Sequence, residues 1–275
     1  MKCDVKLPDG ARVAYAYTGG KTFDPSQPCV VFLHGALNDH SVWTLAARWF
    51  AHHGHAVLAP DLPGHSRSLG PPLASVEALA DWLLALLDAA RVDRAALVGH
   101  SMGSLIALEA AARAPDRVTQ LAMVGTAYPM KVSAALLDSA RVDPLAAIDS
   151  VNAFSHATMA AKPAYPGPGT WLHGADRALM RRVQAGSGDV NLFLNDFEVC
   201  DRYAGGLDAA ARVTCPATLV LGANDQMTMP KQAGAIGAAL KARTIVLESG
   251  HALMGEAPDA LLAALRGALV EAAAA

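Results

Sequence analysis

The stretch Gly99-His100-Ser101-Met102-Gly103 is the most specific pattern in this sequence. A short apolar run precedes it and a run with helical character follows it. A serine between two glycines, entered from a strand and left by a helix, has to occupy a tight turn. Glycine is needed on both sides because a side chain there would collide with the neighbouring strand or helix. The pattern predicts a hydroxyl at the carboxyl end of a sheet, beside helix N–H groups that can receive negative charge.

A second serine motif, Gly64-His65-Ser66-Arg67-Ser68, resembles the first only in part. It lacks the second glycine, and two prolines lie just before it, so no strand runs into it. We interpret this segment as a loop and Ser66 as a turn residue.

Composition excludes several classes of protein. Hydrophobic residues make up 53% of the 275 residues and charged residues 17%, which is enough to bury a core and rules against disorder. The formal net charge is −3 and no basic cluster is present. We therefore expect neither a nucleic-acid partner nor an anionic membrane, and a small molecule as substrate.

The cysteines and the apolar segments indicate a cellular location. Four cysteines are scattered without C-x-x-C spacing, which favours free thiols in a reducing compartment. The chain begins with strand-like segments rather than a basic and then apolar leader. Its most apolar helical segment, 76–90, is interrupted by acidic residues, so no membrane span is expected. These features predict a cytoplasmic protein.

Strands and helices alternate along most of the sequence, which predicts a parallel sheet with right-handed crossovers. The predicted strands are 2–7, 12–18, 29–33, 56–59, 95–98, 118–124, 217–221 and 244–247. The predicted helices are 43–52, 76–90 with Ser75 as its cap, 104–114, 231–242 and a last one from Pro258.

The alternation stops at about residue 129 and resumes after about residue 212. A break of this kind indicates an insertion, and loops at the carboxyl ends of parallel strands lie over the site. We predict a first part of the core at 1–128, a cap at 129–212 and a second part of the core at 213–275. Most apolar residues of the cap should pack its own small core, and a few should line a pocket. The candidates are Met130, Phe154, Met159, Trp171, Leu172, Phe193 and Phe197.

A nucleophilic serine needs a base and an acid, and both are predicted from the ends of late strands. His251 follows the last strand, and Asp225 follows the strand before it. A parallel sheet brings both to the same edge as Ser101. The imidazole would remove the hydroxyl proton, and the carboxylate would orient and stabilise the imidazole. The order Ser, Asp, His is the order expected for this architecture.

The oxyanion would be bound by two backbone N–H groups. One is that of Met102, directly after the serine, and the other is that of Ala36, in the loop after the strand 29–33. Gly35 allows the backbone to turn there, and His34 is expected to organise the loop through hydrogen bonds without a direct chemical role.

The sequence resembles the α/β-hydrolase fold superfamily, in its capped serine hydrolase and esterase branch. The resemblance rests on His34-Gly35, Asp61-Leu62-Pro63-Gly64, the Ser101 motif, Gly222-Ala223-Asn224-Asp225 and Gly250-His251, which occur in the family's order. It implies a mostly parallel eight-stranded sheet flanked by helices, with a helical cap inserted after the sixth strand. It also implies a cofactor-free and metal-free serine hydrolase of esters or related acyl compounds. The serine argues against dehalogenase and epoxide hydrolase activity, because those relatives use an aspartate nucleophile.

Several alternatives remain open at this level. Asp196 or Asp201 could replace Asp225 as the acid. A histidine cluster could bind a metal, although its members more simply mark a helix end, and three arginines could bind a substrate carboxylate, although they more simply form a solvated face. These residues are His52, His53, His55, Arg177, Arg181 and Arg182. The same site could also serve a C–C bond hydrolase, a perhydrolase, an acyltransferase or a ligand receptor without catalysis.

Overall fold

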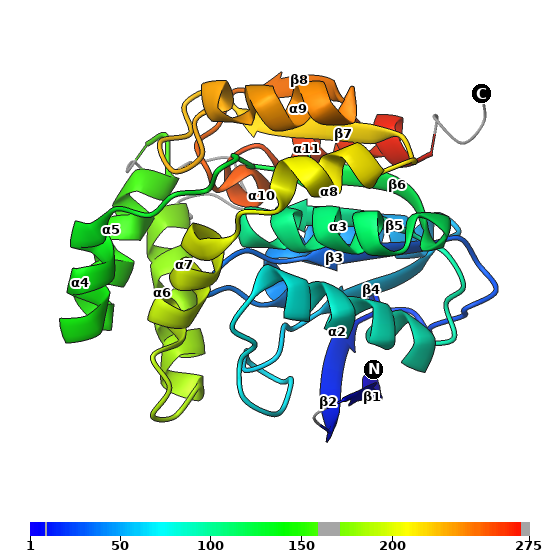
Figure 1. Ribbon diagram of the computed structural model, residues 1–275, viewed down its shortest axis with the longest axis horizontal. Coiled ribbons are helices and arrows are strands. Elements are labelled where there is room, and N and C mark those ends of the chain that lie inside the picture. Colours follow the sequence, from blue (N-terminus) through cyan, green and yellow to red (C-terminus); the bar gives the residue numbers. More distant parts are fainter. Residues whose placement is uncertain (9, 159–170, 271–275) are drawn as a thin grey trace.

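The computed structural model describes residues 1–8, 10–158 and 171–270. In these ranges eight strands form one sheet in the order β1-β2-β4-β3-β5-β6-β7-β8 (Figure 1). The first two strands pair antiparallel and β2 joins β4 antiparallel, whereas all later neighbours are parallel. The strands are β1 (Lys2–Leu7), β2 (Gly10–Tyr17), β3 (Cys29–Leu33), β4 (Ala56–Pro60), β5 (Ala95–His100), β6 (Val118–Val124), β7 (Ala217–Gly222) and β8 (Arg243–Leu247).

The central strands explain why the sheet is parallel. Every residue of β3, β4 and β5 is buried, so these strands are apolar on both faces and need helices on both sides. The edge strand β8 has no fully buried residue. The predicted mostly parallel α/β sheet is therefore confirmed.

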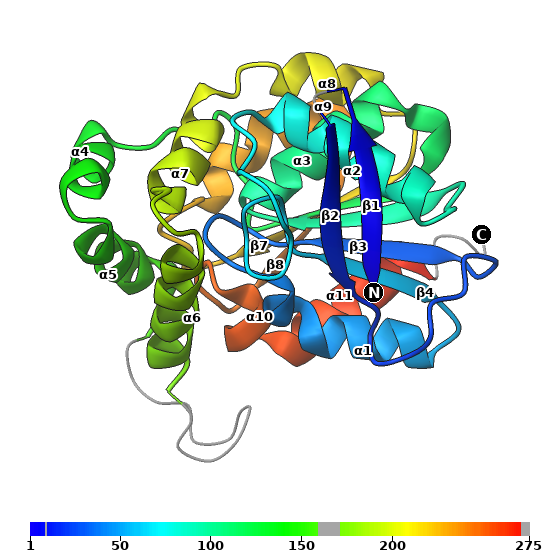
Figure 2. The same cartoon turned by 90° about the horizontal axis from the view of Figure 1, so that it is seen from below.

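Helices cover both faces of the sheet, each with its own core. One face packs against α1 (Thr44–His52) and α11 (Pro258–Leu269). The other face packs against α2 (Val76–Ala89), α3 (Met102–Arg113), α8 (Gly206–Arg212) and α9 (Gly234–Leu240). Figure 2 shows α1 and α11 on the side of the sheet opposite to α2 and α3. Short 3₁₀ turns, His40–Trp43, Pro115–Arg117 and Pro230–Ala233, connect these elements.

Helix boundaries follow the capping signals where these are clear. Ser75 caps α2, since its hydroxyl accepts a hydrogen bond from the N–H of Ala78 at 3.1 Å. The helix after the serine begins at Met102, earlier than the predicted residue 104, because the turn leads directly into it. The predicted helix 231–242 is a 3₁₀ turn followed by the shorter α9, and the short α10 (Leu253–Glu256) was not predicted.

The chain between β6 and β7 contributes helices beyond the carboxyl ends of the strands. They are α4 (Ala134–Val142), α5 (Pro144–Ser155), α6 (Leu172–Gly186) and α7 (Leu192–Arg202), called the cap below. They gather at one end of the sheet (Figures 1 and 2) and share a separate apolar core. By contrast α8, which falls inside the predicted insertion 129–212, packs on α3 in the helix layer of the main core.

No helix in the described ranges combines the length and hydropathy needed to cross a membrane. Of the four cysteines, Cys3, Cys29 and Cys200 are buried and Cys215 is partly buried, and all four are thiols without a disulfide partner.

Candidate active site

Ser101 occupies the sharp turn between β5 and α3. Its φ of 52° and ψ of −120° lie in a region that non-glycine residues rarely adopt, at a cost of order 1–3 kcal/mol. The flanking glycines permit this turn. A Cβ on Gly99 would lie 2.1 Å from the carbonyl oxygen of Gly103, and one on Gly103 would lie 2.6 Å from that of His34. The strand and the helix approach so closely here that only glycine fits at either position.

Backbone hydrogen bonds hold the turn in place. The N–H of Ser101 donates to the carbonyl of Val124 at 2.9 Å, and the N–H of Ser104 donates to the carbonyl of Ser101 at 2.8 Å. The hydroxyl of Ser104 lies 2.6 Å from the same carbonyl and 2.7 Å from the hydroxyl of Thr126. Ser104 therefore adds support to the turn.

His251 and Asp225 lie together after β8 and β7. The Nδ1 of His251 is 2.8 Å from Oδ2 of Asp225, and both residues are buried. Burial opposes the charge of Asp225, but the neighbouring His251 and hydrogen bonds from Thr228 hold its pKa below the ordinary value. The carboxylate is therefore ionised and directs the Nδ1 proton of His251 toward itself.

Thr228 is a third member of this cluster. Its hydroxyl donates to Oδ2 of Asp225 at 2.7 Å and lies 3.1 Å from Nδ1 of His251. The N–H of Thr228 donates to Oδ1 of Asp225 at 2.8 Å. Sequence reasoning missed this residue, although an acid followed three residues later by threonine is a signal of such a turn.

His100 contacts His251 through a hydrogen bond and through its ring. Its Nε2 donates to the backbone carbonyl of His251 at 2.9 Å, and the two ring centroids are 4.7 Å apart. Burial, with the nearby His251, lowers the pKa of His100 to about 3, so this ring is neutral. A neutral ring adds no positive charge beside the candidate base.

The loop after β3 passes close to Ser101. A Cβ on Gly35 would lie 3.1 Å from the Cβ of Ser101, so a side chain there would press on the serine. His34 anchors this loop with both ring nitrogens, to the carbonyl of Gly35 at 2.8 Å and to the N–H of Leu62 at 3.0 Å. Burial, with the nearby His65, lowers the pKa of His34 to about 4, which fits a neutral ring with one donor and one acceptor nitrogen.

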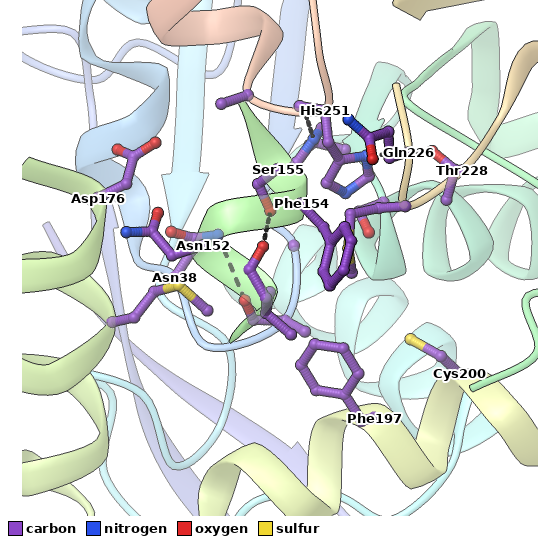
Figure 3. Close-up of a pocket in the computed structure, with 18 of the residues that line it drawn as sticks. Asn38, Asn152, Phe154, Ser155, Asp176, Phe197, Cys200, Gln226, Thr228 and His251 are labelled. Carbon is purple, nitrogen blue, oxygen red and sulfur yellow. Dashed lines mark hydrogen bonds between the residues drawn. The ribbon is translucent and has the colours of Figure 1, made fainter. Parts of the chain in front are cut away.

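A cavity of about 660 Å³ lies between the core and the cap. Ser101, His251 and Ala36 line it from the core, and the labelled side chains of Phe154 and Phe197 enter from the cap (Figure 3). Met130 and Leu172 also line it, as the sequence indicated for some of the apolar residues of the insertion. Of the other candidates, Phe193 packs in the core of the cap, Trp171 is half exposed and Met159 lies outside the described residues.

The alternative acids lie elsewhere. Asp196 contacts His65 and the loop after β3, and Asp201 accepts a hydrogen bond from the N–H of Val132 at 3.1 Å. Within the described residues, neither forms a hydrogen bond or ion pair with His251, whereas Asp225 does. Ser66, in the second serine motif, is an exposed turn residue.

The histidines considered as metal ligands include one that makes local structural contacts. His53 stacks on Trp49 with ring centroids 3.9 Å apart, and its Nδ1 lies 2.6 Å from the Trp49 carbonyl. Within the described residues, the one group with metal-ligand spacing is Asp39, His40 and Asp61, in which His40 is already paired with Asp61 at 2.7 Å.

The three arginines are engaged as well. Arg177 and Arg181 pair with Asp149 at 2.6 and 2.9 Å, and Arg182 pairs with Asp39 at 3.0 Å. They bind carboxylates of the protein itself: the pairs with Asp149 lie within the cap, and the pair with Asp39 joins the cap to the core.

Comparisons with known proteins identify the family of this chain. The model of the alpha/beta hydrolase family matches residues 30–264. An esterase of Mycobacterium tuberculosis is 26% identical over 96% of this chain and 90% of its own. A dihydrolipoyllysine-residue acetyltransferase component of an acetoin cleaving system from Cupriavidus necator is 36% identical over 42% of this chain. The chain spans only 30% of the length of that second relative.

Solved structures show the same fold. An enol-lactonase from Burkholderia xenovorans superposes with a TM-score of 0.79 over 94% of this chain and 96% of its own, at 22% identity. An identity this low carries information on the fold alone.

Proposed function

We infer the activity from one premise, that the chain belongs to the alpha/beta hydrolase family. Within this family, we propose that it is a serine hydrolase that cleaves small-molecule carboxylic esters through an acyl-enzyme. Ser101 is the proposed nucleophile, His251 the general base and Asp225 the residue that orients it. The esterase name of its relative from Mycobacterium tuberculosis, similar over nearly the whole chain, supports this assignment.

The first step forms the acyl-enzyme. Because Nδ1 of His251 faces Asp225, the other ring nitrogen, Nε2, is left to take the proton of the Ser101 hydroxyl. No hydrogen bond joins Ser101 to His251 in the described part of the chain, so the proposed proton transfer requires the hydroxyl and Nε2 to approach each other first. The serine oxygen then attacks the ester carbonyl, and the alcohol leaves with the proton from His251.

Two backbone N–H groups are proposed to stabilise the oxyanion. The N–H of Met102 lies in the first turn of α3, where helix geometry gives it no intrahelical acceptor. The N–H of Ala36 belongs to the loop that passes beside Ser101. Water then attacks the acyl-enzyme with His251 again as base, which releases the acid and restores the serine.

One observation carries this proposal. The strained Ser101 turn and the His251–Asp225 pair come from three separate strand ends, yet Ser101 and His251 border the same cavity. A strained backbone conformation persists only where the surrounding structure imposes it, and such residues cluster at active sites. The cap, which is formed by α4 to α7 of the proposed insertion 129–212, would then select the substrate from the far side of the cavity.

The test is hydrolysis of p-nitrophenyl esters of rising acyl length, run beside thioesters and lactones. Ser101→Ala should lower turnover by a factor on the order of 10⁴ to 10⁶. Ser66→Ala is the matched control, because it removes an exposed serine from the similar motif and should leave turnover unchanged. A wild-type protein that turns over none of these compounds would instead favour a ligand receptor.

A further inference from the structure

Two hydrogen bonds fix the peptide that carries the proposed oxyanion donor. The carbonyl of Gly35 and the N–H of Ala36 belong to one peptide group, and in a trans peptide they point in opposite directions. His34 donates from Nδ1 to the Gly35 carbonyl at 2.8 Å. The N–H of Asn38 approaches the same oxygen at 3.3 Å. Holding this oxygen therefore sets the direction of the Ala36 N–H.

The next peptide is held from the cap. The N–H of Leu37 donates to Oδ2 of Asp196 at 2.8 Å, a contact between residues 159 positions apart. Leu37 has a φ of 55°, a left-handed conformation that a leucine adopts only when its surroundings impose it. Asp196 lies on α7, so a cap residue directly supports a strained loop of the core.

Asp196 is itself fixed by His65 of the core. Nε2 of His65 lies 2.8 Å from Oδ2 of Asp196, and both side chains are 2% exposed. The other ring nitrogen of His65 lies 3.1 Å from the carbonyl of Pro63. Both partners are acceptors, which fits a doubly protonated imidazolium. Burial opposes this charge, but the carboxylate of Asp196 outweighs it and raises the pKa of His65.

We propose that Asp196 is a positioning residue for the oxyanion hole. By binding Leu37 N–H and His65 at one oxygen, it makes the orientation of the Ala36 donor depend on the seating of the cap. The inference rests on the proposed function, because it concerns the same reaction. Nothing in it requires Asp196 to touch substrate.

This arrangement links two parts of the molecule that the chain separates widely. A movement of α7 away from the core would remove the acceptor of Leu37 and release the strained loop. The Ala36 N–H would then be held only through the two hydrogen bonds to the Gly35 carbonyl, and the transition state would be bound less firmly by one of its two donors. Removal of a single such donor lowers kcat by about 10²–10³ in other enzymes.

Three variants test the proposal. Asp196→Ala removes the acceptor, and kcat should fall about 10- to 100-fold with KM within about threefold, because the loss affects the transition state. Asp196→Asn keeps an oxygen that can accept from Leu37 and should recover most of this loss. Glu198→Gln is the matched control, since it removes a carboxylate on the same helix that pairs with Arg141. It should keep the wild-type kcat.

Amide hydrogen exchange at Leu37, followed by NMR, gives a readout that does not depend on activity. Exchange should accelerate at least about tenfold in Asp196→Ala and remain near wild type in Glu198→Gln. The proposal is overturned if Asp196→Ala keeps kcat within threefold, if Asp196→Asn is no better than Ala, or if Glu198→Gln loses as much. If the wild type hydrolyses nothing, the proposed function fails, and unchanged exchange at Leu37 then overturns this inference separately.

Discussion

At the scale of single residues, close approach of backbones determines the site. Gly99 and Gly103 were recognised in the sequence because a side chain at either position cannot fit between strand and helix, and the structure gives the distances. The same reasoning explains why Ser101 adopts a φ of 52°, since the chain has to reverse within one residue. The hydroxyl is then presented at the end of the sheet, clear of both elements.

Gly99→Ala should destabilise the protein strongly. Its Cβ would meet the carbonyl of Gly103 at 2.1 Å, and overpacking against backbone costs about 3 kcal/mol or more. Thermal melting should show a Tm lower by about 5–10 °C. Gly186→Ala, where a Cβ meets nothing within 4 Å, is the control and should melt with the wild type. Equal melting temperatures for the two variants would contradict the packing argument.

Thr228 should matter through its hydroxyl. Thr228→Val removes one of the two donors to Oδ2 of the buried Asp225, and a hydrogen bond to a charged group contributes about 1.5–3 kcal/mol. We expect kcat/KM for ester hydrolysis to fall about tenfold, because Asp225 holds His251 less firmly. Thr228→Ser keeps the donor and should stay within about threefold of wild type. If the valine variant is as active as the serine variant, Thr228 has no part in the site.

At the scale of elements, the sequence was most informative where burial is complete. The sequence predicted strands at 29–33 and 95–98, and β3 and β5 are fully buried there, whereas Ser75 predicted the start of α2. Helix ends without a side-chain cap were harder, and α10 could not be predicted because it has only four residues. The contact from Asp196 to His65 could not be predicted either, since it spans 131 positions and depends on how the cap seats.

The ion pair between α7 and the core predicts a pH dependence of stability. The pKa of His65 is raised above its ordinary value of 6.5, because the Asp196 carboxylate outweighs burial. The stabilisation is therefore complete below about pH 6.5 and is lost as pH rises through the raised pKa. Urea unfolding should show that Asp196→Asn lowers the free energy of unfolding more at pH 6 than at pH 9.

Comparison of the wild type with Asp196→Asn isolates the contribution of the His65–Asp196 pair. His156 also has a raised pKa, owing to Asp176 and despite burial, but it is present in both proteins and cancels in the difference. Glu198→Gln removes a carboxylate of the same helix and should cost the same at both pH values. A cost of Asp196→Asn that grows toward pH 9 would have the wrong sign for this account.

At the scale of the whole molecule, the cavity lies between the carboxyl ends of the strands and the cap. The sequence predicted the sheet from its strand order, and it predicted Ser101, Asp225 and His251 as site residues, of which Asp225 and His251 are in contact in the structure. It could not specify which cap residues face the cavity, because helical spacing alone does not distinguish the side of Phe197 from that of Phe193. In the structure Phe197 lines the cavity and Phe193 packs in the core of the cap.

Phe197→Ala should enlarge the cavity and shift the preference for substrate length. Each methylene that gains an apolar site contributes about 0.8 kcal/mol, so kcat/KM should rise for octanoate relative to butyrate esters by several-fold. The p-nitrophenyl ester series measures this ratio directly. Val142→Ala, at an 88% exposed position of the cap, should leave the ratio unchanged. An unchanged ratio in Phe197→Ala would show that acyl chains bind elsewhere.

The most direct measurement is the mapping of a covalent adduct. Wild-type protein treated with a fluorophosphonate probe and digested should carry one label per chain, on the peptide that contains Ser101. Ser101→Ala should carry none, and His251→Ala should react far more slowly because the hydroxyl keeps its proton. A label on any other residue, or a wild type that stays unlabelled, would contradict the assignment of Ser101 as the nucleophile.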